Sequence, residues 1–435
     1  MLTMQQKLTN LFHVIISLPA TAMGFALSVQ ISALSWLLST QYHLDIHEIG
    51  LVWAAGPLAG IIGQVVIGLI SDRVWFWGGR RRPFILVGGT LAALMLFLLP
   101  RIDAINDALG IGNLLIVAVA VALTLDLSIN ISFNPTRSII ADVTPEGNPR
   151  TKGYTWMQTI SGFWGVMAYV LGASFGNFTL IVAGVVIVFL FSVVPTFFIT
   201  EPRDLEARAE EAGTRRSTNW PQLWRIYVAH GFSWIGVQAM FVYIIAFIQQ
   251  KMIPDGMSAA DASAQSGQII AIAFAVLNTV GFLLPAFVLE PIAERIGRVK
   301  THLSSVGIMA AGYFAIAWLV SSPLALYALM AVVGIGWGAI VSLPFAIMSE
   351  EVDRGRMGFY MGIFNLSVVL PQLFVSLVLG RVIQDAPDKA IIFLICGGTL
   401  AASSLLWLLV RDTGAERGTV HGKAGASSPG GPSGH

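Results

Sequence analysis

Residues 71–85 read SDRVWFWGGRRRPFI, a charged loop between two apolar stretches. A related loop, EPIAERIGRVK, occupies residues 290–300. Each loop holds an acid–arginine pair and then a Gly-Arg pair, namely Asp72-Arg73 with Gly79-Arg80, and Glu294-Arg295 with Gly297-Arg298. The two Gly-Arg pairs are 218 residues apart in a chain of 435. This spacing predicts two related halves built around equivalent loops.

A second repeat has an offset of 209 residues, and in it Pro135, Asp142 and Gly153 recur as Pro344, Glu351 and Gly362. Acids and arginines at helix ends can pair with each other and with helix termini across the seam between two halves. We therefore predict a latch at one mouth of the molecule, formed by Asp72, Arg73, Gly79, Arg80, Asp142, Glu294, Arg295, Arg298 and Glu351. The alternative is that the arginines only follow the enrichment of basic residues in cytoplasmic loops.

The composition is that of an integral membrane protein. Hydrophobic residues make up 55% of the chain and charged residues 11%, against about 25% charged in soluble domains, and the mean hydropathy is +0.75. We predict an all-α membrane protein with twelve transmembrane helices in two six-helix repeats. The expected spans are 11–38, 48–70, 83–101, 112–140, 153–176, 177–199, 222–250, 266–289, 301–320, 324–348, 357–383 and 389–410.

The longest charged interruption, residues 200–221, separates an N-terminal half (1–199) from a C-terminal half (222–410). Residues 411–435 are rich in Gly, Ser and Pro, a composition that predicts a disordered cytoplasmic tail. Basic residues are concentrated in the even-numbered loops and at the termini; the exceptions among all 25 are Arg101, Arg137, Lys251, Arg381 and Lys389. This bias places both termini on the cytoplasmic side of the cytoplasmic membrane.

Several classes of protein are disfavoured. A net charge of +1 gives no reason to expect a nucleic-acid partner, and a single cysteine, Cys396, allows neither an intrachain disulfide nor a cysteine-rich metal site. The sequence has no phosphate-binding P-loop, metal-ligand cluster or nucleophile–base pair. We therefore expect no enzymatic activity, no metal and no cofactor.

Residues 122–137, ALTLDLSINISFNPTR, carry polar side chains within the fourth apolar span. Of 24 acidic residues, only Asp126 lies deep in such a span, where a charge costs about 2.5–3.5 kcal/mol. Burial favours the protonated form of a carboxyl group, as a proton carrier requires. On a helix, Asn130 is one turn away, and Arg137 lies about 20° round and about 16 Å along. Alternatively, Asp126 is a structural acid, Arg137 a snorkelling cation and Asn130 an interhelical hydrogen-bonding residue.

These motifs resemble the major facilitator superfamily, and more narrowly the sucrose–proton symporters and their bacterial relatives among the glycoside–pentoside–hexuronide transporters. The resemblance covers most of the chain except the central loop and tail. It rests on SDR with GRRRPFI, GPLAGIIGQVVIGLISDR, LDLSINISFNPTRSIIAD, TEP, LPFAIMS and MGIFNLSVVLPQLFVS.

The resemblance implies a role for each matching residue. It makes Asp126 the proton-binding acid, and it makes Arg137, in the pattern P-x-R-x-x-x-x-D formed with Pro135 and Asp142, essential for substrate or coupling. One departure concerns the seventh span, where plant members carry an acidic cluster and this chain reads FVYIIAFIQQK (241–251). Either coupling here relies on Asp126 alone, or the substrate contacts differ from those of the plant sucrose carriers.

A sugar site needs amides for hydroxyl groups and a flat aromatic surface for C–H faces. Candidate substrate-binding residues are Gln30, Gln64, Gln158, Gln238, Asn278, Asn365, Gln372 and Trp234, with Asn130 beside Asp126. Other aromatic residues at similar depths are Phe25, Trp156, Tyr243 and Trp337. Each of them alone could equally serve helix packing or interfacial anchoring.

The sequence thus predicts a monomeric symporter in the lipid bilayer that imports an α-glucoside disaccharide, of the sucrose or maltose type, with a proton. Sodium remains open as the coupling ion, although a lone carboxylate suits a proton better. One alternative is an exporter of an amphipathic compound with the same fold. Another is a membrane assembly factor or sensor without transport activity.

Overall fold

The described residues of the chain form helices joined by short loops. The computed structural model describes residues 3–60, 67, 70, 74–144, 148–201, 218–349, 351 and 357–411. Among them, the only β-type pairing is an isolated bridge between Phe76 and Gly79. Nine helices in these ranges are long and apolar enough to cross a membrane, which agrees with the prediction of an all-α membrane protein.

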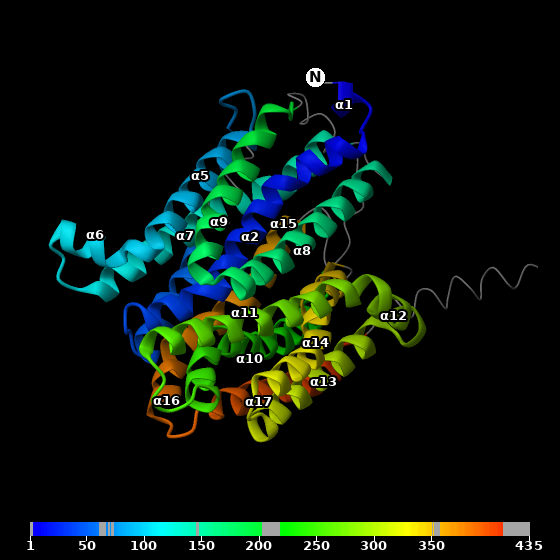
Figure 1. Cartoon of the computed structure of the whole chain (residues 1–435). Helices are drawn as coiled ribbons and strands as arrows, with labels where there is room; N and C mark the ends of the chain where they lie inside the picture. Colours follow the sequence, from blue (N-terminus) through cyan, green and yellow to red (C-terminus); the bar gives the residue numbers. More distant parts are fainter. Residues whose placement is uncertain are drawn as a thin grey trace, which may run out of the picture.

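The helices form two groups, one from each half of the chain (Figure 1). The N-terminal group comprises α1 Thr3–Gln6, α2 Asn10–Thr40, α3 Ile46–Trp53, α5 Arg82–Leu98, η1 Leu99–Arg101, α6 Ile102–Leu109, α7 Leu114–Val143, α8 Asn148–Phe175, α9 Asn177–Val193 and η2 Val194–Phe197. The C-terminal group comprises α10 Trp220–Met252, α11 Ala259–Leu284, η4 Pro285–Leu289, α12 Glu290–Ile296, α13 Arg298–Leu319, α14 Pro323–Ser349, α15 Met357–Phe374, η6 Val375–Leu379, α16 Gly380–Asp385 and α17 Ile391–Trp407.

These elements coincide with the expected spans. The fifth and twelfth spans correspond to α8 and to the shorter apolar helix α17. The second span begins with α3 and stays helical from residue 55 to residue 60, beyond which most of it lies outside the described residues. Most of the central loop and all but the first residue of the expected tail also lie outside them.

Close packing within the N-terminal half depends on small side chains. Helix α5 packs against α7 on one side and α9 on the other. At Gly88 an added Cβ would collide with Ser132 of α7, and at Gly89 with Ser192 of α9. Since lipid provides little hydrophobic force between helices, such close approach is a main source of helix association in membranes.

Hydrogen bonds between the two halves gather at one side of the molecule. We call the side with Arg80, Arg81 and Lys300 the basic side, and the side with the loops 41–45, 253–258 and 386–390 the opposite side. At the opposite side, Nε1 of Trp36 donates to the carbonyl of Ser263 (2.7 Å), and Oγ of Ser35 donates to the carbonyl of Val242 (3.0 Å). Further pairs are Ser39 with Gln249, and His47 with Gln384.

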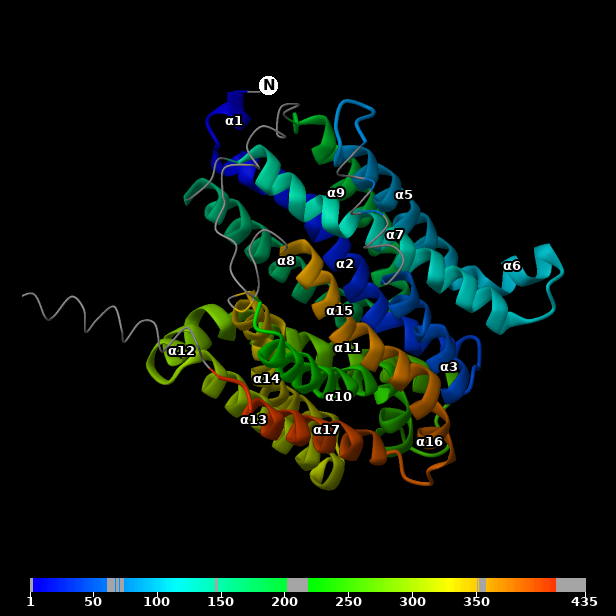
Figure 2. The ribbon, with the colours of Figure 1, turned by 180° about the vertical axis from the view of Figure 1, so that it is seen from behind.

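The views in Figures 1 and 2 agree with this arrangement. Helices α3 and α16 lie side by side where the two halves meet. By contrast, α1 and α12 lie at distant corners on the basic side in both views. The structure therefore has its two halves joined at the opposite side.

Gly50 of α3 is a point of contact that closes the opposite side. A Cβ at this position would lie 2.6 Å from the backbone oxygen of Ser376 and would collide with the hydroxyl of Tyr243. We expect Gly50→Ala to lower the free energy of unfolding by about 1–3 kcal/mol, because the added methyl group overpacks this contact. Thermal unfolding of the purified protein in detergent measures the effect.

Gly24→Ala is the matched control, because a Cβ on Gly24 of α2 would meet nothing within 4 Å. Alanine is the better helix former, so this variant should unfold at or slightly above the wild-type temperature. Equal melting temperatures for Gly50→Ala and wild type would contradict the tight contact between α3 and the C-terminal half.

Candidate functional site

A cavity of about 320 Å³ lies between the two halves. This volume is at the lower end of the range for small-molecule sites. Its walls combine charged, amide and aromatic side chains from both halves. They include Gln30, Trp53, Gly56, Asp126, Asn130, Phe133, Trp234, Gln238, Phe241, Trp337, Asn365 and Gln372. Among the described residues that line this cavity, Asp126 is the only acid.

Asp126 lies in the middle of α7, and its residue surface is only 6% exposed. Its Oδ2 accepts a hydrogen bond from Nε2 of Gln30 on α2 (3.0 Å). Gly56 faces the same carboxyl group, and a Cβ there would lie 3.3 Å from Oδ2. A single neutral amide compensates an ionised carboxylate poorly.

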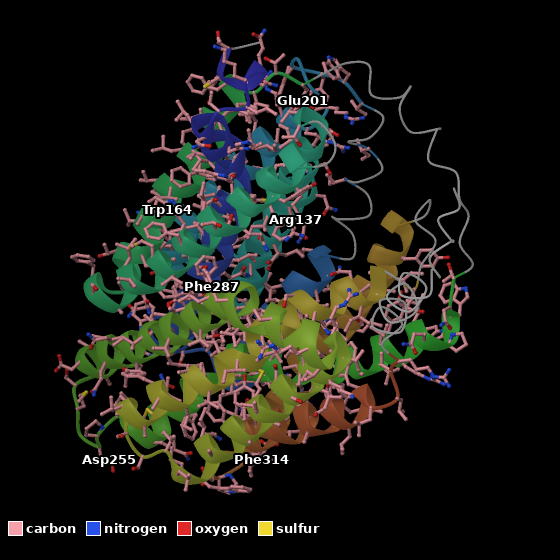
Figure 3. All side chains as sticks on the ribbon, turned by 90° about the vertical axis from the view of Figure 1, so that its right-hand side faces the viewer. Arg137, Trp164, Glu201, Asp255, Phe287 and Phe314 are labelled. Carbon is pink, nitrogen blue, oxygen red and sulfur yellow. The ribbon has the colours of Figure 1, made fainter. Side chains whose placement is uncertain are left out.

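The other two residues predicted on the Asp126 face of α7 are placed differently. Asn130 lines the cavity, and its Nδ2 donates to the backbone oxygen of Asp126 (2.8 Å). Arg137 is an exposed residue that does not line the cavity; its guanidinium lies 4.2 Å from the ring centre of Phe133, which does. In Figure 3, Arg137 lies nearer to the C-terminal half than Glu201 does. Its carbonyl accepts a hydrogen bond from Tyr154 of α8 (3.2 Å).

The C-terminal wall of the cavity is largely aromatic. Trp337 of α14 makes edge-to-face contacts with Trp234 (6.0 Å between ring centres) and Phe241 (5.4 Å) of α10. The indole N–H of Trp337 donates to Oδ1 of Asn278 (3.2 Å), and that of Trp234 donates to Nε2 of His230 (2.9 Å). Neither acceptor residue lines the cavity.

Besides Asn130, four of the predicted amide residues lie together at this cavity. Nε2 of Gln372 on α15 donates to Oε1 of Gln238 on α10 (3.2 Å), and Asn365 and Gln30 line the same space. Gln158 is exposed on α8, away from the cavity lining, and Asn278 lies behind Trp337. Gln64 lies outside the described residues.

Sequence reasoning did not select Gly56, Phe241 or His230 as site residues. Gly56 has no side chain, and nothing in the sequence shows that it faces Asp126. The spacing of His230 and Trp234, one helical turn apart, was the available signal for the contact between them.

Charged residues form a second cluster at the basic side of the N-terminal half. Arg80 binds Asp142 through two hydrogen bonds (2.9 and 3.1 Å), and Arg81 adds a third (3.2 Å). The carboxylate of Glu201 accepts the backbone N–H groups of Arg80, Arg81 and Arg82 (2.8–2.9 Å). It thereby caps the start of α5, where the helix dipole favours an anion.

The C-terminal half has a comparable arrangement at Glu351. Its carboxylate accepts a hydrogen bond from Nδ2 of Asn219 (3.0 Å), and its carbonyl accepts the Asn219 N–H (3.0 Å), immediately before α10. Arg295 is exposed near the end of α12, and Arg298 begins α13. Asp72, Arg73 and the side chain of Glu294 lie outside what the structure describes. Asp142 and Glu351 thus each hold partners within their own half, and a latch between halves stays a prediction.

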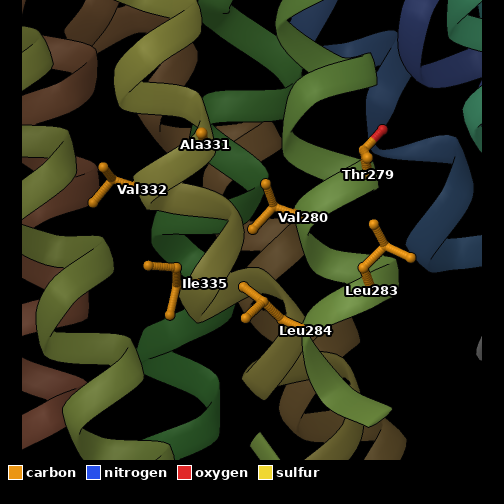
Figure 4. Close-up of a pocket in the computed structure, with 7 residues that line it drawn as sticks. All are labelled: Thr279, Val280, Leu283, Leu284, Ala331, Val332 and Ile335. Carbon is orange, nitrogen blue, oxygen red and sulfur yellow. The ribbon is translucent and has the colours of Figure 1, made fainter. Parts of the chain in front are cut away.

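A different hollow, of about 470 Å³, lies between α11 and α14 (Figure 4). Its lining consists of Thr279 and six aliphatic residues, namely Val280, Leu283, Leu284, Ala331, Val332 and Ile335. It offers a hydroxylated compound almost no hydrogen-bonding groups. The cavity around Asp126 is therefore the candidate substrate site.

Comparison with known proteins gives concordant results. A family model for the Major Facilitator Superfamily matches residues 16–376, with a further match over 259–428. The chain is 30% identical over 171 residues to a general alpha-glucoside permease of Schizosaccharomyces pombe, a match that spans 35% of this chain and 31% of the permease. It is 23% identical over 402 residues to the sucrose transport protein SUT3 of Oryza sativa subsp. indica, covering 75% of this chain and 78% of that protein.

The fold also matches a solved structure. The nucleoside transporter NupG superposes with a TM-score of 0.71 at 13% identity, over 92% of this chain and 99% of that one. This likeness supports the expected fold of twelve helices in two halves.

Two ion pairs differ in burial and allow a prediction. In the pair with Arg80, the Asp142 side chain is 11% exposed; in the pair with Lys251, that of Asp388 is 58% exposed. The Ala390 backbone N–H, and after it Lys251, lower the pKa of Asp388. We expect Asp142→Asn to lower the free energy of unfolding by about 1–3 kcal/mol, because two arginines lose their charged acceptor.

Asp388→Asn removes a carboxylate from an exposed pair and should leave the melting temperature unchanged, since such pairs contribute little. Thermal unfolding of both variants in the same detergent makes the comparison. Equal destabilisation by the two substitutions would show that the Asp142 cluster does not stabilise the N-terminal half.

Proposed function

The chain belongs to the major facilitator superfamily, and from this premise we propose that it imports an α-glucoside disaccharide of the sucrose or maltose type together with a proton. The observation that carries the proposal is the composition of the central cavity. One buried carboxyl group, several amides and an aromatic wall face the same space between the two halves. The chain is a multi-pass membrane transporter, and the substrate and coupling ion are what we propose.

The amides and the aromatic residues suit a sugar. Gln30, Asn130, Gln238 and Gln372 each bring a donor and an acceptor, as a ring of hydroxyl groups requires. The ring carbons of Trp234 and Trp337 suit the apolar C–H face of a pyranose. The names of the permease and the sucrose transport protein support this substrate class.

Asp126 is the proposed proton-binding residue. It is buried, it lines the cavity, and its carboxyl oxygen is hydrogen-bonded to neutral Gln30. When protonated, it places no net charge between the halves, so the loaded carrier can reorient. When ionised and without substrate, it resists passage through the apolar interior, and this resistance couples the two gradients.

We assign Arg137 to this coupling. Its contact with Phe133 connects the cation to the wall of the cavity, on the same helix as Asp126. Movement of that wall would bring the positive charge closer to Asp126 or take it away. A closer cation stabilises the carboxylate and promotes proton release.

The orientation follows from the distribution of charge. We propose that the basic side faces the cytoplasm, with both termini there, and that the protein works as a monomer in the cytoplasmic membrane. With the halves joined at the opposite side, the structure then corresponds to the inward-facing part of an alternating-access cycle. The cluster of Arg80, Arg81 and Asp142 and the contact of Glu351 with Asn219 lie on the side where a cytoplasmic latch would form.

Uptake into sealed vesicles tests the function. Reconstituted protein should accumulate labelled sucrose or maltose when the outer solution is made acidic, and the accumulation should collapse when a protonophore is added. A sodium gradient without a pH gradient should have no effect. Efflux driven by protons would favour the exporter of amphipathic compounds, and absence of any gradient-dependent glycoside movement would reject the symporter.

Asp126→Asn should abolish accumulation against a gradient while the protein still folds, because asparagine has the same shape but carries no exchangeable charge. Exchange of labelled for unlabelled sugar across the membrane should persist, since that reaction does not require release of the proton. Vesicles preloaded with unlabelled sugar measure exchange beside active uptake. Active accumulation by a normally folded Asp126→Asn protein would disprove the assignment.

Gln30→Leu should reduce active uptake about tenfold, because it removes the hydrogen bond from Asp126 while nearly conserving volume. Gln158→Leu is the control, since Gln158 is a predicted amide residue that lies outside the cavity lining. Initial rates in the same vesicle assay compare them. A similar loss in both variants would mean that the effect does not come from the cavity.

A further inference from the structure

Two tryptophans in the cavity wall have their only hydrogen-bond donor occupied from outside the cavity. Trp234 donates its indole N–H to His230, and Trp337 donates its own to Asn278. Both indoles contribute to the lining, whereas His230 and Asn278 do not. The substrate therefore meets carbon atoms of these two rings rather than their N–H groups.

His230 is held in place for this contact. It lies one turn before Trp234 on α10, is 1% exposed, and stacks on Phe364 of α15 with 4.8 Å between ring centres and 17° between planes. The next residue on α15, Asn365, lines the cavity. The imidazole is thus fixed between the aromatic wall and the helix that bears a cavity amide.

The hydrogen bond determines which nitrogen of His230 carries the proton. Because Nε2 accepts from Trp234, a neutral ring must carry its hydrogen on Nδ1. That Nδ1 has no hydrogen-bond partner among the described residues. Among the described residues, Trp234 is therefore the hydrogen-bond partner of this imidazole.

We infer that His230 is a specificity-determining positioning residue, which fixes the Trp234 indole so that the cavity presents an aromatic carbon surface to the apolar face of the sugar. The inference rests on the proposed function and deepens it. It divides recognition between two walls. The amides and Asp126 form hydrogen bonds with the hydroxyl groups of the sugar. The aromatic residues of the C-terminal half, fixed by residues outside the cavity, contact its C–H groups.

The physical reason is the cost of a free indole N–H in this place. Without an acceptor on His230, the Trp234 donor would be unpaired, or would turn toward a substrate hydroxyl or a cavity amide. Either change takes the ring out of its edge-to-face contact with Trp337. Binding of the sugar should weaken, while proton coupling at Asp126 remains intact.

His230→Phe tests the inference, because phenylalanine keeps the stack on Phe364 and removes the acceptor. We expect the KM for labelled sucrose or maltose to rise about tenfold, with Vmax within about twofold of wild type. Accumulation should still follow the pH gradient. His230→Gln should restore a KM near wild type, because the glutamine oxygen can replace Nε2 as the acceptor.

A double-mutant cycle separates this role from simple packing. Trp234→Phe removes the N–H, so adding His230→Phe to it should not raise the KM further. The control is His13→Leu, which alters a buried imidazole of the N-terminal half, one that stacks on Trp156 and does not line the cavity. Its KM should equal that of wild type. Should His230→Phe fail to fold, His230→Leu carries the same expectation.

The outcomes distinguish this inference from the proposed function. If the wild type transports sucrose or maltose and His230→Phe has an unchanged KM, or if His230→Phe raises the KM equally in the Trp234→Phe background, the inference is wrong and the function stands. If the wild type moves neither sugar under any gradient, the proposed function fails first.

Discussion

A carboxyl group buried between apolar helices constrains how this transporter is built and how it can move. Asp126 is paired with the neutral amide of Gln30 rather than with a cation, so its ionised form is poorly compensated in this conformation. If Asp126 had only a structural role, a fixed arginine or lysine beside it would stabilise its carboxylate better than an amide does. The nearest matched cation along the helix, Arg137, instead stacks on Phe133. An acid whose compensation can vary is suited to loading and releasing a proton.

The two halves share a framework but differ in chemistry. Asp142 and Glu351 occupy equivalent positions, and each ties helix ends together within its own half. The side chains that line the cavity do not repeat in this way. The N-terminal half supplies the acid together with Gln30 and Asn130, and the C-terminal half supplies the indoles of Trp234 and Trp337 and an amide pair. Position 346, the counterpart of Arg137 in the C-terminal half, is an alanine, which agrees with this difference in chemistry between the halves.

The fold and the position of Asp126 could be predicted from the sequence, because helices that cross a membrane are long and apolar and a charged residue within them stands out. Apolar run lengths placed the spans, and a lone acid among them identified Asp126. Helix facing was harder to infer. Gln30 and Gln158 look alike as amides within apolar spans, yet one contacts Asp126 and the other is exposed on α8. The difference between the two glutamines depends on which neighbouring helix each one faces, and so does the role of His230. The helices are only weakly amphipathic, so a single sequence does not show which face of a helix meets which neighbour.

The division between walls also explains how a substrate could control the movement of the halves. A small ligand that touches only the acid and amides of α2 and α7 would interact with one half. A disaccharide that contacts Asp126 and Gln30 on one side and Trp234 and Trp337 on the other joins both halves. Its binding energy can then stabilise a conformation in which both walls close on it, as a ligand shifts an equilibrium only through differential contacts. In the symport that we propose, coupling requires this bridge and the neutral acid at the same time, because the bridge draws the walls together and protonation removes the charge that would oppose their closing.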